Sequence, residues 1–125
     1  MLRYSKLLTL CIGLLGAHPA HAQFSLVQSG VPQDIDPSEH VDLADVDLDG
    51  DWDAAFANGG DVGARQNVLW INMGGAQGRS LGTFEDQTAP RFPVINDVSR
   101  EIEFVDIDGD GDCDAYVAND STILN

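Results

Sequence analysis

The sequence predicts an all-β fold built from four-stranded antiparallel units, and three observations support this class. Apolar and polar residues alternate with a period of two in short runs bounded by Gly, Pro, Asn and Asp, which is typical of half-buried strands. The segment 41–58 matches the segment 102–119 position by position, which indicates an internal repeat. No segment combines a helical apolar period with helix-capping residues. Four short strands in a unit of this length suit one blade of a β-propeller, although the unit is longer than typical blades.

Residues 1–22 are predicted to be a secretory signal peptide. Arg3 and Lys6 provide the positive start, an apolar run follows, and residues 20–22 form a small-x-small cleavage pattern. The apolar run is too short to span a bilayer. We therefore expect the mature chain to begin at Gln23, to have no membrane span, and to be extracellular, or periplasmic in a bacterium. A buried N-terminal helix is the less favoured alternative.

The mature chain is strongly acidic. The full sequence has 21 Asp and Glu against six Lys and Arg, a formal net charge of −15. Without residues 1–22, four Arg face the same 21 acids, so the net charge becomes −17. This balance argues against nucleic acid and anionic membranes as partners, because both are bound through Lys and Arg. Self-repulsion at this charge density favours bound cations, and calcium is the obvious extracellular candidate.

Four short strands are predicted in the first complete unit. They cover residues 40–45, 54–57, 67–72 and 83–88. An acidic loop separates the first two, a Gly-rich turn precedes the fourth, and Pro90 and Pro93 end the unit. Residues 24–28 weakly match residues 84–88, so the mature chain is expected to begin with the last strand of another unit. Residues 121–125 are expected to enter a further strand of the second unit.

Two acidic loops with the pattern D-x-D-x-D-G-D-x-D are the candidate functional sites. Loop 1 contains Asp45, Asp47, Asp49, Asp51 and Asp53 at positions one, three, five, seven and nine. Loop 2 contains Asp106, Asp108, Asp110, Asp112 and Asp114 at the same positions. Alternate residues of a tight loop can direct short carboxylates at one centre. Gly50 and Gly111 at position six permit the positive φ that the turn requires.

Calcium fits these loops better than other ions. It takes about six to eight oxygen ligands, whereas magnesium demands stricter octahedral geometry and keeps its waters. Position seven usually offers its backbone carbonyl, so the carboxylates of Asp51 and Asp112 are expected to stay outside. An EF-hand is rejected, because position twelve is Phe56 or Val117 instead of Glu. A solvated acidic turn without an ion is disfavoured, because two copies share one register. We therefore predict two structural Ca²⁺ sites.

The combined motifs resemble FG-GAP repeats, the calcium-binding repeats of integrin-α-type propellers, and their bacterial relatives, the VCBS repeats. The residues that support this are the acidic loop, the ending Ala57-Asn58, the run N-V-L-W-I-N at 67–72 and the run G-T-F-E-D-Q-T at 82–88. The resemblance implies a seven-bladed propeller of four-stranded blades. It assigns the metal to the carboxylates at positions one, three, five and nine of each loop. It assigns the backbone carbonyls of Asp51 and Asp112 as further ligands.

Two departures from the family pattern affect this interpretation. The literal Phe-Gly and Gly-Ala-Pro signatures of integrin repeats are absent, which favours the bacterial type. Residues 23–125 contain one whole blade and parts of two others, and a propeller must close its ring to protect its strand edges. We therefore expect the missing blades to come from a longer chain or from assembly.

The predicted function is non-enzymatic calcium binding by a secreted propeller segment that serves adhesion or the recognition of a protein or glycan. No Ser-His-Asp or Cys-His arrangement is evident in the sequence. Trp52 and Trp70 are expected to pack within blades, and a role as carbohydrate platforms is the less favoured alternative. Two other functions remain open. The first alternative is an accessory domain of a longer secreted enzyme, and the second is a spacer of calcium-stiffened repeats.

Overall fold

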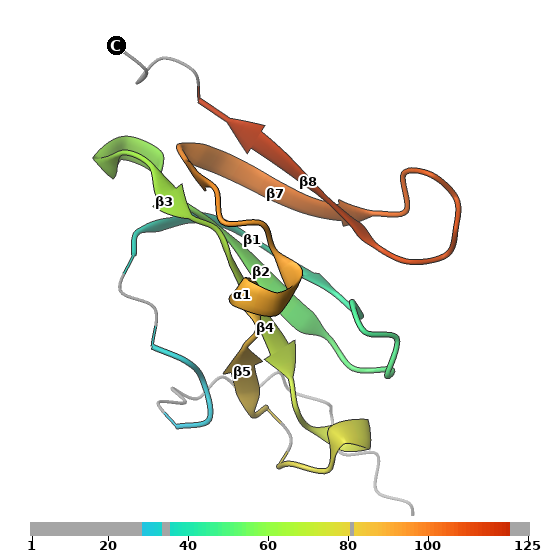
Figure 1. Ribbon diagram of the computed structural model, residues 1–125. Coiled ribbons are helices and arrows are strands. Elements are labelled where there is room, and N and C mark those ends of the chain that lie inside the picture. The colour runs from blue at the N-terminus through green and yellow to red at the C-terminus, as the bar shows by residue number, and fades with distance from the viewer. Residues whose placement is uncertain (1–28, 34–35, 81, 121–125) are drawn as a thin grey trace, which may run out of the picture.

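The computed structural model describes residues 29–33, 36–80 and 82–120 (Figure 1). The predicted signal peptide at 1–22 and the predicted strands at 24–28 and 121–125 lie outside these residues. The described residues form antiparallel β-sheets with little helix, which confirms the all-β class. Among them, no helix is long and apolar enough to cross a membrane.

A four-stranded antiparallel sheet contains the predicted strands of the first unit. Its strands follow chain order as β1 (Ser38–Ala44), β2 (Asp53–Asn58), β4 (Val68–Asn72) and β5 (Phe84–Asp86). Strand β1 ends at Ala44, one residue before the predicted boundary. Asp45 already belongs to loop 1, because its carboxylate accepts hydrogen bonds from the backbone N–H groups of Asp49 and Gly50. The sheet has the strand number and the chain order that the sequence predicts.

The fourth strand is shorter than predicted, because residues 88–91 form a helical turn, α1 (Thr88–Arg91). The Asp86 carboxylate accepts hydrogen bonds from the backbone N–H and the hydroxyl of Thr88, at 2.9 and 2.6 Å. Pro90 is compatible with the first turn of a helix, because an N–H at this position has no partner within the helix. A four-residue helix is too short to show a periodic pattern, and the sequence analysis missed it for this reason.

A second hairpin has the same construction as the β1–β2 hairpin. It pairs β7 (Ser99–Val105) with β8 (Asp114–Asn119), and each hairpin has one register irregularity near its open end. In each, a serine hydroxyl donates to an asparagine Oδ1 across the irregularity: Ser38 to Asn58 at 2.7 Å and Ser99 to Asn119 at 2.9 Å. Ser99 and Asn119 occupy the positions that correspond to Ser38 and Asn58 at the offset of the internal repeat.

A small two-stranded sheet lies outside the prediction. It pairs β3 (Arg65–Gln66) with β6 (Asn96–Asp97). The Gln66 side chain secures it by donating to the Pro93 carbonyl at 3.1 Å and accepting from the Ile95 N–H at 2.8 Å. Such short strands carry no alternation, so tertiary contacts alone determine this pairing.

The core lies where the two hairpins meet. Ala55, Ala57, Leu69, Ile71 and Ile102 form one buried cluster. Two small alanines on β2 allow β7 to pack closely against the four-stranded sheet. Trp70 also packs as predicted, with its ring centroid 4.5 Å from that of Phe56. Trp52 differs from the prediction, because it lies within loop 1 and is 63% exposed.

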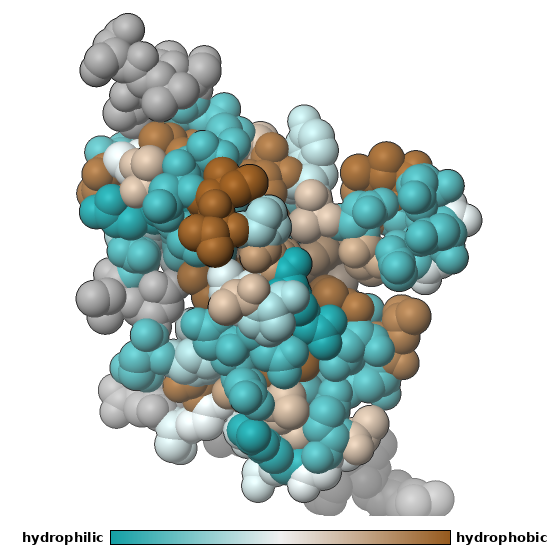
Figure 2. Space-filling view, viewed as in Figure 1, coloured by the Kyte–Doolittle hydropathy of each residue, from teal (hydrophilic) through white to brown (hydrophobic). Residues whose placement is uncertain are grey.

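Loop 1 and loop 2 leave their hairpins on the same side of the molecule, at the right of Figure 1. Loop 2 projects furthest, and Figure 2 shows mostly hydrophilic residues over it. This arrangement follows from topology, because each loop joins the first and second strands of equivalent hairpins. The candidate sites are therefore neighbours on one face.

Candidate metal centres

Loop 1 is folded by hydrogen bonds from its own backbone to its first aspartate. The N–H of Asp49 donates to Asp45 Oδ1 at 2.9 Å, and the N–H of Gly50 donates to Asp45 Oδ2 at 3.0 Å. Gly50 has φ 96°, as the turn requires. Leu48 also has a positive φ, 61°, which costs a leucine about 1–2 kcal/mol. Loop 2 has Gly109 at the equivalent position, with φ 79°.

Asp53 anchors loop 1 to the four-stranded sheet. Its side chain is fully buried and accepts two backbone hydrogen bonds at 2.8 Å, from the N–H of Val46 and the N–H of Asn72 on β4. Burial raises the pKa of the Asp53 carboxyl, and the charges of Asp47 and Asp49 add to this, although the two backbone donors oppose it. A carboxylate in this position has a fixed orientation and gains from a neighbouring cation.

Several oxygens of loop 1 are buried without any hydrogen-bond partner. They are Oδ1 of Asp47, Oδ2 of Asp49 and both carboxylate oxygens of Asp51. Asp45, Asp47 and Asp53 each also offer an oxygen, and these three atoms lie within 4.8 Å of one another. A buried carboxylate oxygen without a donor is costly, and a bound cation removes this cost. The donor set consists of oxygens only, which fits a hard cation such as Ca²⁺.

The Asp51 carboxylate, which is expected to stay outside the site, is buried. Both of its oxygens are buried, and Oδ2 lies 3.2 Å from where a Cβ on Gly75 would be. Burial raises the pKa of Asp51, with further contributions from the charges of Asp49, Asp53 and Asp47. The reason is tertiary, because the turn after β4 packs over position seven of loop 1. A side-chain ligand at Asp51 is therefore as consistent with the geometry as a carbonyl ligand.

Gln77 is a candidate ligand that sequence analysis missed. It lies in the 3₁₀ turn η2 (Gly75–Gln77), well beyond loop 1 in the sequence, and its Nε2 donates to Asp47 Oδ2 at 3.1 Å. Its Oε1 is buried without a partner. Amide oxygens are common calcium ligands. No local pattern relates a glutamine in a Gly-rich turn to an acidic loop so far away in sequence.

Loop 2 has the same internal bonding but is more open. The Asp106 carboxylate accepts from the N–H groups of Gly109, Asp110 and Gly111 at 2.7–3.1 Å. Asp114 accepts from the N–H of Ile107 at 3.0 Å, as Asp53 does from Val46. Asp106, Asp108 and Asp114 each offer an oxygen within 4.8 Å of the others.

Exposure distinguishes the two loops. Residues 106–112 are all exposed, and no described segment covers them as η2 covers loop 1. The pKa of Asp112 is raised, chiefly by the negative charge of Asp110. Loop 2 therefore has the same arrangement of carboxylates as loop 1 but lacks its buried, unpartnered oxygens in the described part of the chain. We expect loop 1 to be the tighter site.

Cationic side chains do little to neutralise loop 1. The Arg91 guanidinium reaches Asp47 Oδ2 only at 4.0 Å, and its side chain is 36% exposed. One distant, solvated arginine offsets little of the charge of five carboxylates.

No family model, curated protein or solved structure matches this chain.

Proposed function

We propose that this chain is a segment of a secreted, non-enzymatic β-propeller of the FG-GAP or VCBS type, with structural Ca²⁺ in loop 1 and loop 2. The strongest support for calcium is the group of buried oxygens without partners on Asp47, Asp49, Asp51 and Gln77. These oxygens, with those of Asp45 and Asp53, are of the number and kind that Ca²⁺ binds. Calcium would join η2 to loop 1 and so rigidify the end of the four-stranded sheet.

The blade assignment is supported by the sheet order. The sheet β1-β2-β4-β5 is a four-stranded antiparallel meander, which is the form of one propeller blade. The β7–β8 hairpin, packed against β1 and β2, supplies the first two strands of a second blade. Images of the secreted protein should show ring-shaped particles, and rods would instead support a spacer of stacked repeats.

Recognition of a protein or glycan, in adhesion, is the role we propose for this scaffold outside the cell. Trp52 supports this role, because an indole within loop 1 that is 63% exposed can stack on a sugar or an apolar side chain. A calcium-ordered loop would hold such a side chain in a defined position. Trp52→Ala should weaken ligand binding without changing calcium affinity.

Calcium titration of the full chain tests the metal assignment. We expect calcium to raise the thermal midpoint, chelator to lower it, and magnesium to have a smaller effect. The double variant Asp45→Ala with Asp106→Ala should lose most of the calcium-induced shift. Asp61→Ala is the matched control, because its side chain is 87% exposed and lies outside both loops. A midpoint that does not respond to calcium in the folded wild-type chain would refute the assignment.

A further inference from the structure

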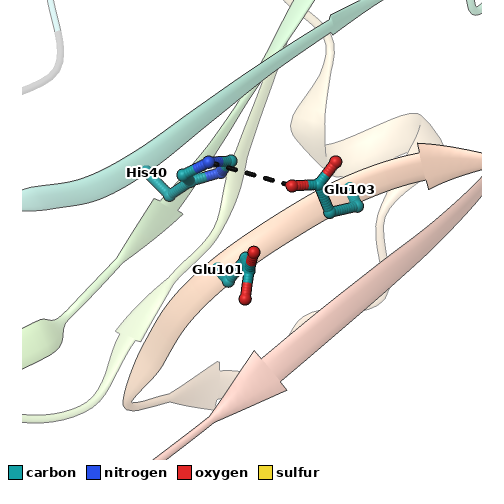
Figure 3. Close-up of side chains that lie close together, drawn as sticks. All are labelled: His40, Glu101 and Glu103. Atoms are coloured by element: carbon teal, nitrogen blue, oxygen red, sulfur yellow. Dashed lines mark ion pairs between the residues drawn. The ribbon is translucent and has the colours of Figure 1, made fainter.

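A third group of metal-binding side chains lies between the two hairpins, away from both acidic loops. It consists of His40 on β1 and of Glu101 and Glu103 on β7 (Figure 3). Residues 101 and 103 share one face of β7, because side chains alternate along a strand, and Ile102 between them is buried in the core. One ligand atom from each of the three side chains lies within 4.8 Å of the other two. The packing of β1 against β7 therefore creates this group.

A backbone contact orients the histidine for metal binding. His40 Nδ1 lies 3.0 Å from the carbonyl oxygen of Ile102. A carbonyl can only accept, so Nδ1 carries the proton, and in the neutral imidazole Nε2 has a free lone pair. Figure 3 shows the imidazole directed at Glu103. Its Nε2 lies 3.9 Å from Oε1 of Glu103. Metal-binding histidines commonly have this second-nitrogen contact to a carbonyl.

We propose that His40 Nε2 and the carboxylates of Glu101 and Glu103 bind one first-row divalent cation, with Zn²⁺ as the best fit. Zinc–nitrogen and zinc–oxygen bonds are about 2.0–2.2 Å, so an ion fits between Nε2 and Oε1 after a small adjustment of the flexible glutamate. Three protein ligands leave a fourth tetrahedral position for water. Calcium is a poor occupant, because it prefers oxygen ligands and this site supplies an imidazole nitrogen.

The site would join successive hairpins instead of ordering one loop. Position 40 of the first hairpin corresponds to position 101 of the second, so His40 and Glu101 stand at equivalent positions on two neighbouring strands. The next contact along the same pair of strands is a hydrogen bond from the Phe104 N–H to Asp42 Oδ2 at 2.7 Å. A metal at His40 would add a further, stronger link between β1 and β7 to these two hydrogen bonds. Zinc binding should therefore stabilise the packing of one hairpin against the other.

An ion pair between imidazolium and Glu103 is the competing explanation of this geometry. The two side chains are 36% and 47% exposed, so such a pair would contribute little to stability. It would also leave Glu101 without a role, whereas a metal site uses all three side chains. The two explanations differ in whether zinc binds.

Calorimetric titration of the full 125-residue chain with zinc chloride, in excess calcium to occupy the acidic loops, distinguishes them. We expect one zinc per chain, and His40→Gln and Glu101→Gln should each weaken binding by more than about tenfold. Glu85→Gln is the control, because Glu85 lies on β5, is 45% exposed and pairs with Arg79. The variant Asp45→Ala with Asp106→Ala should keep zinc binding, which makes this result independent of the calcium proposal.

Circular dichroism should establish that each variant is folded before titration. If His40→Gln does not fold, Glu101→Gln still tests the proposal, because Glu101 is exposed. Absence of zinc binding in excess calcium, or equal zinc affinity in the wild-type chain and Glu101→Gln, would overturn it.

Discussion

Replacing Asp47 by Asn should change stability in opposite directions with and without calcium. Asp47 Oδ1 is buried without a partner, and its Oδ2 accepts from Gln77 Nε2 at 3.1 Å. The substitution Asp47→Asn keeps the size of the side chain and removes its charge. The Gln77 amide can turn over to present its Oε1 to the new amide, so packing should change little. The effect should therefore be mainly electrostatic.

The magnitude follows from the distances within loop 1. Oxygens of Asp45, Asp47 and Asp53 lie within 4.8 Å of one another, and two like charges at this separation repel by about 0.9 kcal/mol even in water. Neutralising Asp47 removes two such pairs, so the metal-free chain should gain about 1–2 kcal/mol after screening by salt. In calcium the same change removes a ligand. Each tenfold loss of affinity lowers the calcium-induced stabilisation by about 1.4 kcal/mol, so a loss of more than about thirtyfold outweighs the gain and makes the variant less stable than the wild type in calcium.

Urea unfolding followed by circular dichroism, once in chelator and once in excess calcium, measures both effects. Asp108→Asn is the matched comparison, because Asp108 has position three in the exposed loop 2 and should show smaller changes in both conditions. The reasoning is refuted if Asp47→Asn destabilises the chain in chelator. Equal changes in chelator and calcium would mean that no ion binds at loop 1.

Three further predictions concern the same loop. Asp53→Ala should destabilise the chain by about 3 kcal/mol or more even in chelator, because two buried backbone donors, on Val46 and Asn72, lose a charged acceptor. Urea unfolding measures this loss, and a decrease in the free energy of unfolding of less than about 1 kcal/mol would contradict the prediction. The metal-free chain should become more stable as the pH falls from about 7 towards 4, because the raised pKa values of Asp51 and Asp53 mean that the folded state binds protons more tightly than the unfolded chain, whose Asp pKa is about 3.9. With calcium the trend should reverse, because protons compete with the ion for the carboxylates. Thermal melts at several pH values measure both trends. A thermal midpoint of the metal-free chain that drops as the pH falls over this range would argue against the prediction. Gln77→Ala should weaken calcium binding at one of two sites by about threefold or more, measured by calorimetry, and unchanged affinity at both sites would exclude Gln77 as a ligand.

The sequence by itself determined the strands and the loops that join them. Alternation predicted β1, β2 and β4 close to their observed bounds, because one face of each strand must be buried. The match between segments 41–58 and 102–119 anticipated that the β7–β8 hairpin would repeat the β1–β2 register. The spacing of the aspartates also placed the first, third and ninth residues of each loop close together, because a tight loop brings alternate side chains to one centre.

Only the tertiary structure decided which groups are buried and which distant residues meet. Gln77 and Gly75 approach loop 1 through the turn after β4, and this contact buries the Asp51 carboxylate. The β3–β6 pair and the one-turn helix α1 are too short to leave a periodic signal. The meeting of His40 with Glu101 and Glu103 depends on two strands from distant parts of the sequence packing side by side. Local spacing specifies how a loop curls, but burial and long-range contacts depend on how complete sheets pack, and no short pattern encodes that packing.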